Sequence, residues 1–455
     1  MTTKRLSKGE PDYVIIMITA SLLALGLLMV YSASYVWAVA TDKDPSYYFL
    51  RQCTWAALGI AGALLMYRVD HGFWRRWAIP IMAVVLLALL VVLFTGQRKY
   101  GAISTFLAGS IQPSEPAKVA MIIYLATWLS SKGEKLRDVS YGLLPFGVLL
   151  GLVAGLIVLQ PDLGAAILIV FIAIAMFFLA GADPKQVALS LGASVLTFAL
   201  LVRTSNNAQR RISDFVAIVR DPQQGGHPHV RMALEALAKG GVIGTGIPDG
   251  TYKQLGRVPL PFSDSIFPIL GEEMGLLGTW LVLALFALLA YRGFRIALRA
   301  ENSYGMLLAS GLTCWFIFQA LINVAVNTAM VPYTGITLPF ISHGGSSLVS
   351  CLAGVGLLLS ISRGGDGGKR EPEKRTRKGN TKRRATLHEA LDFRRRDRGT
   401  RLSSSGRRGS TARRDGKQTR SSGSRTTLSA QAGKRRATSR STSQRRKGTS
   451  RSVRR

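Results

Sequence analysis

The chain has 455 residues, of which 58 are Lys or Arg and 25 are Asp or Glu, so its formal net charge is +33 although 48% of its residues are hydrophobic. One soluble fold rarely combines so much charge with so much apolar sequence. Three cysteines are too few for a disulfide framework, and the sequence has no CxxC pair, HExxH motif or P-loop, which excludes the recognisable zinc, nucleotide-binding and disulfide-rich classes.

The charge is unevenly distributed along the chain. Residues 363–455 contain 32 basic and 7 acidic side chains, whereas residues 1–362 contain 26 basic and 18 acidic ones. The C-terminal part is rich in Ser, Thr and Gly and has one aromatic residue, Phe393, so it cannot bury enough apolar surface to fold. We therefore predict a cytoplasmic N-terminus (1–13), a membrane domain (14–362) and a disordered basic cytoplasmic tail (363–455).

Apolar stretches recur throughout the predicted membrane domain, and a membrane-spanning helix needs about 20 such residues. So many long, charge-poor runs favour membrane spans over the alternative, buried helices of a soluble protein. We predict an all-α polytopic membrane protein with ten transmembrane helices. The expected spans are Val14–Val39, Cys53–Tyr67, Ala78–Thr95, Ala117–Leu129, Tyr141–Leu159, Leu163–Gly181, Val187–Val202, Ile266–Tyr291, Gly305–Met330 and Ile336–Ile361.

The basic residues of the short connections set the expected orientation. With the N-terminus inside, ten Lys or Arg residues fall in inner loops and four in short outer loops, as the positive-inside rule requires. We therefore expect both termini in the cytoplasm. One outer segment, residues 203–265 between the seventh and eighth helices, is far longer than the others, and loops of that length are commonly functional. We predict a large extracytoplasmic loop there.

A polar cluster, Gln112-Pro-Ser-Glu-Pro-Ala-Lys118, lies at the outer end of the fourth span. A helix start explains most of it, with Ser114 as N-cap and Glu115 at the positive helix end. It does not explain Lys118, because a cation inside an apolar run costs about 2.5–3.5 kcal/mol at the membrane centre. Glu115 and Lys118 are three residues apart, so we expect them on one helix face.

Four more carboxylates lie near the outer ends of spans. Asp162, in Gln-Pro-Asp-Leu-Gly, fits an N-cap of the following helix, with a functional role as the open alternative. Asp264 immediately precedes a span, and N-capping is again the simplest interpretation. Glu272 and Glu273 lie further in. Two adjacent carboxylates at that depth are expected to face the bundle or water rather than lipid.

The last polar cluster begins at Asn323 and continues through Pro332-Tyr-Thr-Gly335 to Ser347. Asn323 and Asn327 are four residues apart and share a helix face, which is typical of interhelical hydrogen bonding. The segment Leu338-Pro-Phe-Ile-Ser-His-Gly-Gly-Ser-Ser347 permits either a close helix contact or a broken helix over a polar cavity. His343 alone favours a structural hydrogen bond over a ligand role.

These clusters, in this order, resemble the SEDS family of cell-wall polymerases, FtsW, RodA and SpoVE. The resemblance covers about residues 13–363 and rests on Gln-Pro-Ser-Glu with Lys118, Gln-Pro-Asp-Leu-Gly, Gly-Glu-Glu-x-Gly and Leu-Pro-Phe-Ile-Ser-x-Gly-Gly-Ser-Ser. It implies ten membrane helices with a large outer loop between the seventh and eighth. It also implies polymerisation of lipid II into glycan strands on the outer face of the plasma membrane. Phe340 favours the division type, FtsW.

The sequence departs from the family pattern around the essential Asp. That residue normally lies in His-Thr-Asp-Phe, whereas Phe262–Ser265 reads Phe-Ser-Asp-Ser, so Asp264 is kept and its neighbours differ. Leu260 replaces the usual Glu, and His343 replaces the usual Tyr. The loop segment that begins at His229 also lacks the family's Tyr-Gln and Gln-Ser pairs.

The resemblance implies roles for individual residues. We expect Asp264 to act as the base for the acceptor hydroxyl, and Glu115 to orient Lys118 or to assist the proton transfer. Lys118, also expected to be catalytic, would hold the departing pyrophosphate together with other cations at the outer face, Arg210, Arg211, Lys253 or Arg257. The expected substrate-binding residues are Arg210, Arg211, Lys253, Arg257, Asn327, Ser346 and Ser347, and the expected structural supports are Asp162, Glu272 and Glu273. A divalent cation, Mg²⁺ or Mn²⁺, is also implied, although the sequence shows no ligand set for it.

The implied partners are lipid II, a class B penicillin-binding protein transpeptidase and other division proteins at the septum of a bacterial plasma membrane. The basic tail is expected to bind anionic lipid, at about 1 kcal/mol per basic residue, with a dispensable solvated extension as the alternative and nucleic acid less favoured. Two other functions stay open. A lipid-linked precursor flippase or transporter would carry coupling charges nearer mid-bilayer, and a non-catalytic scaffold would only recruit the transpeptidase. Roles in division, elongation or sporulation are not distinguished.

Overall fold

The computed structural model describes residues 9–95, 97–99, 102–105, 112–247, 250–251 and 262–365. Residues 1–373 form one compact unit. The predicted basic tail, apart from Arg363–Gly365 at the end of a helix, lies outside the described residues, and so do the first eight residues. The expected substrate-binding residues Lys253 and Arg257 also lie outside them.

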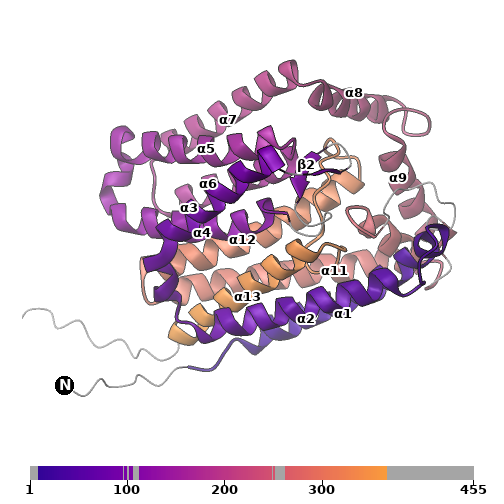
Figure 1. Cartoon of the computed structure of the whole chain (residues 1–455), viewed down its shortest axis with the longest axis horizontal. Coiled ribbons are helices and arrows are strands. Elements are labelled where there is room, and N and C mark those ends of the chain that lie inside the picture. Colours follow the sequence, from indigo (N-terminus) through magenta and orange to yellow (C-terminus); the bar gives the residue numbers. More distant parts are fainter. Residues whose placement is uncertain are drawn as a thin grey trace, which may run out of the picture. The chain divides into compact units, whose positions relative to one another are not determined.

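The described part of the chain is almost entirely helical (Figure 1). A short antiparallel hairpin, β1 (Gln97–Lys99) with β2 (Ala102–Thr105), interrupts the expected all-α pattern. The α-helices are α1 (Tyr13–Ala40), α2 (Tyr47–Arg68), α3 (His71–Thr95), α4 (Ser114–Lys132), α5 (Leu144–Leu159), α6 (Leu163–Leu179), α7 (Pro184–Thr204), α8 (Asn206–Arg220), α9 (Pro228–Gly240), α11 (Ile266–Arg299), α12 (Ser303–Asn327) and α13 (Gly345–Gly365), with a 3-10 turn at Gly133–Arg137 and a π turn at Val139–Leu143 leading into α5.

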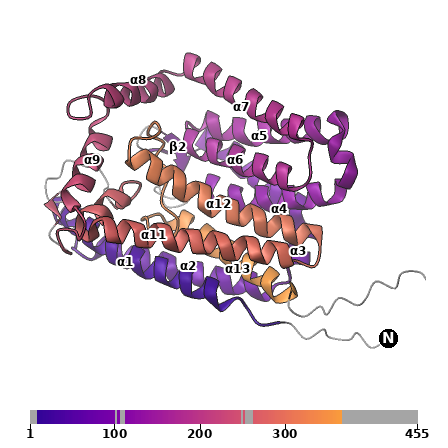
Figure 2. The same ribbon diagram turned by 180° about the vertical axis from the view of Figure 1, so that it is seen from behind.

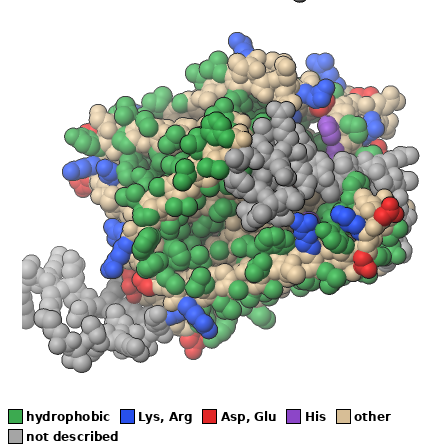
Figure 3. All heavy atoms as spheres, in the orientation of Figure 1, with side chains coloured by type: hydrophobic (Ala, Val, Ile, Leu, Met, Phe, Trp, Pro, Cys, Tyr) green, Lys and Arg blue, Asp and Glu red, His purple; other side chains and the backbone are tan. Residues whose placement is uncertain are grey.

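Eight helices among the described residues are long and apolar enough to cross a membrane, and α6 is a shorter apolar helix. Helix α4 coincides with the predicted fourth span but carries more polar sequence. Hydrophobic side chains cover the middle of the bundle on the face shown in Figure 3, whereas charged side chains gather toward its ends. The fold is therefore that of a polytopic helical membrane protein. The count of ten spans stays a prediction.

The core of the bundle is built around α12. This helix is apolar nearly all round, the pattern of a helix buried on all sides, and its Trp315 and Phe316 are fully buried. Gly311 lets another helix approach closely, since a Cβ there would lie 2.6 Å from the sulfur of Met176 on α6. Helix α7 is the opposite case. Its apolar side chains, such as Leu196, are largely exposed, as expected for a surface that faces lipid.

The prediction for the tenth span is wrong in its first third. The helix begins at Gly345, whereas residues 336–344 form an irregular segment without helical structure. Phe340 has a positive φ of 65°, which a helix does not allow, and Pro339 cannot donate a helical hydrogen bond. The hydroxyl of Ser342 instead accepts from the backbone N–H of Leu338, 2.8 Å away. This segment is the broken-helix alternative that the Gly-Gly-Ser-Ser run had left open.

The predicted eighth span is also interrupted. Helix α11 covers 34 residues, which is longer than a bilayer core requires, and Gly275 within it has non-helical angles of φ 67° and ψ −164°. Glycine takes such angles without a steric penalty, so the kink falls at Gly275. The part of α11 before Gly275, which carries Glu272 and Glu273, thereby forms a short separate arm.

The described part of the predicted long loop, residues 203–265, contains two helices, α8 and α9, that its composition did not suggest. Helices α8 and α9 lie at the end of the bundle opposite to the N-terminus, with α8 following directly on α7 (Figures 1 and 2). The two views agree that α9 lies against the start of α11. This end of the molecule holds the polar clusters that the sequence singled out.

Candidate active site

Asp264 lies in the turn before α11 and is half-buried. The structure contradicts the N-cap interpretation, because the N-cap residue of α11 is Ser265, and it makes no side-chain capping bond. The Asp264 carboxylate instead accepts a hydrogen bond from the hydroxyl of Tyr333 through Oδ2. The Asp264 backbone carbonyl accepts from Nδ2 of Asn323 at 2.9 Å and from Nδ2 of Asn327 at 3.0 Å. Both the backbone and the side chain of Asp264 are therefore fixed from outside α11.

Two histidines at the start of α9 lie beside this carboxylate. The ring of His227 stacks on the ring of Tyr333 with centroids 5.6 Å apart, and the ring of His229 lies 5.2 Å from it. His229 is buried and its Nε2 contacts the hydroxyl of Ser265. Burial lowers the pKa of His229 below its usual value, the charge of Asp264 opposes that shift, and His227 adds to it. His229 is therefore a neutral group near pH 7.

A cavity of about 400 Å³ opens next to Tyr333. It lies between the turn from α5 to α6, the end of α7, helix α8 and the irregular segment after α12. Arg210, Arg211, Asp214 and His227 supply its charged and titratable lining, and side chains such as Leu163 and Phe215 supply its apolar wall. Such a lining suits an anionic group attached to an apolar chain. The expected substrate-binding residues Arg210 and Arg211 thus lie together.

Polar side chains on one face of α12 connect Asp264 to the irregular segment that begins at Ile336. Asn323 donates to the carbonyl of Ile336 at 2.7 Å as well as to that of Asp264. One turn earlier, Gln319 donates to the carbonyl of Thr337 at 3.0 Å. Asn323 and Gln319 are fully buried. The predicted shared face of Asn323 and Asn327 is confirmed, and it holds the irregular segment in place.

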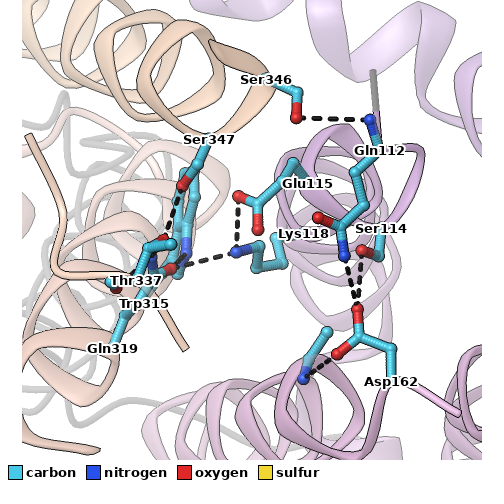
Figure 4. A network of polar contacts seen from close by, with 11 residues as sticks. Gln112, Ser114, Glu115, Lys118, Asp162, Trp315, Gln319, Thr337, Ser346 and Ser347 are labelled. Carbon is cyan, nitrogen blue, oxygen red and sulfur yellow. Dashed lines mark hydrogen bonds and ion pairs between the residues drawn. The ribbon is translucent and has the colours of Figure 1, made fainter. Parts of the chain in front are cut away.

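The predicted pair on α4 is confirmed. The ammonium of Lys118 lies 2.7 Å from the carboxylate of Glu115, and both side chains are buried (Figure 4). The same ammonium donates to Oε1 of Gln319 at 3.1 Å and lies 5.4 Å from the ring of Trp315. Trp315 donates to that same oxygen at 2.7 Å. Lys118 is thus enclosed, and it is not among the residues that line the cavity of Arg210 and Arg211.

Asp162 joins the starts of two helices. Its Oδ1 accepts from the backbone N–H of Ala165 at 3.1 Å, so the predicted N-cap of α6 is confirmed. Its Oδ2 accepts from Gln112 at 2.8 Å and from the hydroxyl of Ser114 at 3.1 Å (Figure 4). The predicted N-cap role of Ser114 is wrong, because Ser114 is the first residue of α4 and its hydroxyl is turned to Asp162.

The two serines at the start of α13 complete this network. The hydroxyl of Ser346 accepts from the backbone N–H of Gln112 at 3.3 Å. Ser347 lies 3.2 Å from the hydroxyl of Thr337, which is also within 3.4 Å of Gln319. These expected substrate-binding residues therefore link α13 to α4 and α12 within the protein (Figure 4).

Glu272 and Glu273 tie the long loop and α1 to the arm of α11 before Gly275. The carboxylate of Glu272 accepts from the backbone N–H of Thr251 at 3.0 Å and lies 3.5 Å from the ammonium of Lys239. The carboxylate of Glu273 accepts from the hydroxyl of Ser32 on α1 at 2.7 Å. Both glutamates are fully buried, as expected for carboxylates that face the bundle.

Glycines make the close approach of α9 to α11 possible. A Cβ on Gly240 would lie 1.9 Å from the carbonyl oxygen of Gly271, and a Cβ on Gly244 would lie 2.2 Å from that of Glu273. Beyond α9, the backbone N–H of Thr245 donates to the carbonyl of Glu272 at 2.9 Å. The Gly-rich run 240–246 is thus a packing element that wraps the kink of α11.

The residues that sequence reasoning missed are aromatic or amide side chains brought together by the fold. His227, Gln319 and Trp315 were not singled out, although Gln319 contacts Lys118. Tyr333, which contacts Asp264, was named only as part of the segment Pro332-Tyr-Thr-Gly335, without a role of its own. The described residues include no group of three or more His, Cys, Asp or Glu side chains placed to hold a metal.

The bundle and its polar end define a class: an integral membrane protein with buried carboxylates, a buried lysine and a basic, apolar-walled cavity at one end. The family model described as "Cell cycle protein" (FtsW, RodA, SpoVE) matches residues 13–366. The chain belongs to this family.

Similar proteins match most of this chain and nearly their own whole length. A probable peptidoglycan glycosyltransferase FtsW from Trichlorobacter lovleyi is 37% identical over 361 residues, which cover 78% of this chain and 94% of that protein. Stage V sporulation protein E from Bacillus subtilis is 38% identical over 373 residues, covering 80% and 99%.

Solved structures agree with these relatives. A chain from a structure titled as the coordination of polymerization and crosslinking by a peptidoglycan synthase complex has a TM-score of 0.63 and 29% identity, and the match covers 78% of this chain and 98% of that chain. The rod shape determining protein RodA of Thermus thermophilus has a TM-score of 0.58 and 28% identity, covering 78% and 97%.

Proposed function

We propose that this protein is a peptidoglycan glycosyltransferase that polymerises lipid II into glycan strands on the outer face of the plasma membrane. The observation that carries the proposal is the fixed carboxylate of Asp264, whose partner Tyr333 lines a cavity with Arg210 and Arg211. The curated relatives that carry the glycosyltransferase name match nearly their whole length. A membrane protein with an apolar-walled basic cavity suits a substrate whose pyrophosphate is attached to a lipid.

In this mechanism Asp264 acts as the general base. The hydroxyl oxygen of the acceptor sugar forms the new bond to the anomeric carbon of the donor, and the bond from that carbon to the pyrophosphate oxygen breaks. The hydroxyl proton passes to Asp264, and the lipid pyrophosphate leaves with the bonding electrons. Arg210 and Arg211 offer guanidinium groups to that developing negative charge. The Lys118–Glu115 pair supports the site indirectly. Lys118 holds the side chain of Gln319, and Gln319 in turn holds the backbone at Thr337.

The divalent cation, Mg²⁺ or Mn²⁺, is a separate proposal. Every step above uses side chains of the chain alone. A cation that arrives with the pyrophosphate of the substrate would neutralise part of its charge. Polymerisation in the presence of EDTA, followed by addition of each metal, tests this requirement.

The partner and the location follow from the same proposal. A class B penicillin-binding protein transpeptidase would crosslink the strands, and a similar solved chain comes from a peptidoglycan synthase complex. The protein would act at the division septum with both termini in the cytoplasm. In the described part, the start of α1 and the end of α13 meet, because Gly9 donates to the carbonyl of Arg363 at 3.1 Å. The two ends of this described part therefore lie on the same side of the bundle.

The full-length protein in proteoliposomes, supplied with lipid II, tests the proposal. Glycan strands that appear without any other polymerase are the expected result. Lipid II that crosses the bilayer without being polymerised would favour a flippase. A protein that makes no strands alone or with its transpeptidase, yet binds the transpeptidase, would be a scaffold.

A further inference from the structure

The contact between Tyr333 and Asp264 joins two parts of the chain that are 69 residues apart in sequence. Tyr333 belongs to the irregular segment between α12 and α13, where the backbone turns sharply at Ala329 (φ 54°) and Gly335 (φ 74°). Nη1 of Arg211 on α8 lies 3.3 Å from the carbonyl oxygen of Tyr333 and 3.4 Å from that of the next residue. The backbone that carries the Tyr333 ring is thus held from α8.

The ring of Tyr333 is held from α9. His227 lies parallel to it, with an interplanar angle of 4°, and His229 packs against it at 59°. His229 also contacts Ser265, the residue that follows Asp264. Two elements of the long loop and the turn before α11 therefore converge on one phenol hydroxyl and one carboxylate.

We propose that Tyr333 is a positioning residue for the reaction, which holds Oδ2 of Asp264 and leaves proton transfer from the acceptor to Oδ1. The inference rests on the proposed function, because it assigns a role in the same reaction. A purely structural role would need only the shape of the ring, since the ring already packs between His227 and His229.

The hydroxyl of Tyr333 has a second effect. A hydrogen bond donated to a carboxylate favours the ionised form, which is the form a general base needs. Burial, together with the negative charge of Asp264, raises the pKa of Tyr333 well above its usual value, while Arg211 opposes the shift. Tyr333 therefore remains a donor throughout the working pH range. The charged or titratable groups that contact Tyr333 and Asp264 include, from α8 and α9, Arg211, His227 and His229.

The test compares Tyr333→Phe with the wild type in the full-length protein. Loss of the hydrogen bond from Tyr333 removes a donor that favours the ionised carboxylate, so the acid limb of the polymerisation–pH profile should move to higher pH. Tyr291→Phe, at an exposed tyrosine on α11, is the matched control and should leave the profile in place. A profile that falls in height without moving would overturn the proposal.

A second variant keeps the shape of the side chain. Difluorotyrosine introduced at position 333 is a stronger donor, and it should move the acid limb to lower pH. Folding of each variant is checked by its melting temperature in detergent. If difluorotyrosine and Phe leave the limb where the wild type has it, Tyr333 only fills space.

An infrared titration separates this proposal from the proposed function. The carboxyl band of Asp264, assigned by its loss in Asp264→Asn, can be followed with pH whether or not the protein polymerises lipid II. A band that titrates at higher pH in Tyr333→Phe supports the inference, and an unchanged band refutes it. If wild-type protein makes no glycan, the proposed function fails and this titration still decides the role of Tyr333.

Discussion

The ammonium of Lys118 and the carboxylate of Glu115 lie 2.7 Å apart within α4, and both residues are buried. One turn of helix carries both, as their spacing of three requires. The arrangement explains a cation within an apolar span. The charge of Lys118 is balanced by Glu115, and the ammonium also donates a hydrogen bond to Gln319 on α12. A buried pair of this kind fixes the relative placement of α4 and α12.

Removing one member of this pair should therefore be costly. Lys118→Met leaves Glu115 as a buried charge and is expected to lower the free energy of unfolding by about 3–5 kcal/mol. The double variant Glu115→Gln with Lys118→Met should recover much of that loss. Thermal melting in detergent measures both. Arg231→Met, which breaks the exposed pair of Arg231 with Glu235, is the control and should change little. Additive losses in the double variant would contradict a coupled pair.

The packing of α9 on α11 predicts a steric effect. Gly240→Ala places a Cβ 1.9 Å from a backbone oxygen, so α9 must separate from α11, and we expect loss of polymerisation together with a clear drop in melting temperature. Gly147→Ala on α5 meets no atom within 4 Å and should leave both measurements unchanged. If Gly240→Ala behaves like Gly147→Ala, the loop is not packed on α11 as described.

Asp162 should contribute more to the stability of the folded protein than an ordinary helix cap does. Asp162→Ala removes the cap of α6 and the acceptor for Gln112 and Ser114, so the loss in unfolding free energy should exceed the ~1 kcal/mol typical of a cap. Asp183→Ala removes a cap from α7 that accepts from Lys185 alone, and serves as the comparison. Equal losses in the two variants, measured by melting temperature, would contradict the joining role.

The buried His229 is expected to make the stability of the folded protein depend on pH. Its pKa in the folded protein is lowered by burial, whereas in the unfolded chain it is about 6.5. As pH falls below about 6.5, the unfolded chain takes up a proton that the folded protein refuses, so stability decreases toward acid pH. His229→Gln should make the fall in melting temperature between pH 7 and pH 5 shallower. An identical slope in the wild type and the variant would show that His229 is not excluded from protonation.

Much of the fold could be predicted because apolar runs and helix spacing are local signals. The bounds of α1 and α6 lie close to the predicted spans, the Glu115–Lys118 pair followed from helical spacing, and the cap at Asp162 followed from a turn between two apolar runs. The start of the last helix could not be predicted. Residues 336–344 are apolar enough to suggest a span, and the tertiary contacts of Asn323 and Gln319 stabilise an irregular backbone instead.

The surroundings of Asp264 were the part that the sequence did not reveal. A carboxylate before a helix is normally a cap. The sequence cannot show that the partner of Asp264 is instead the hydroxyl of Tyr333, which lies in the segment after α12. His227 and Tyr333 have no spacing relation, since they meet only when α9 folds against the segment after α12. Long-range contacts of single side chains are not encoded in any local period.

The central claim is that Asp264 is the base for glycan polymerisation. The direct measurement is the rate of strand formation from lipid II by the full-length protein and by Asp264→Asn, which keeps the size of the side chain and its backbone contacts with Asn323 and Asn327. Loss of a general base is expected to lower the rate by about 10²–10⁴-fold with an unchanged melting temperature. A variant that polymerises lipid II at the wild-type rate would contradict the account.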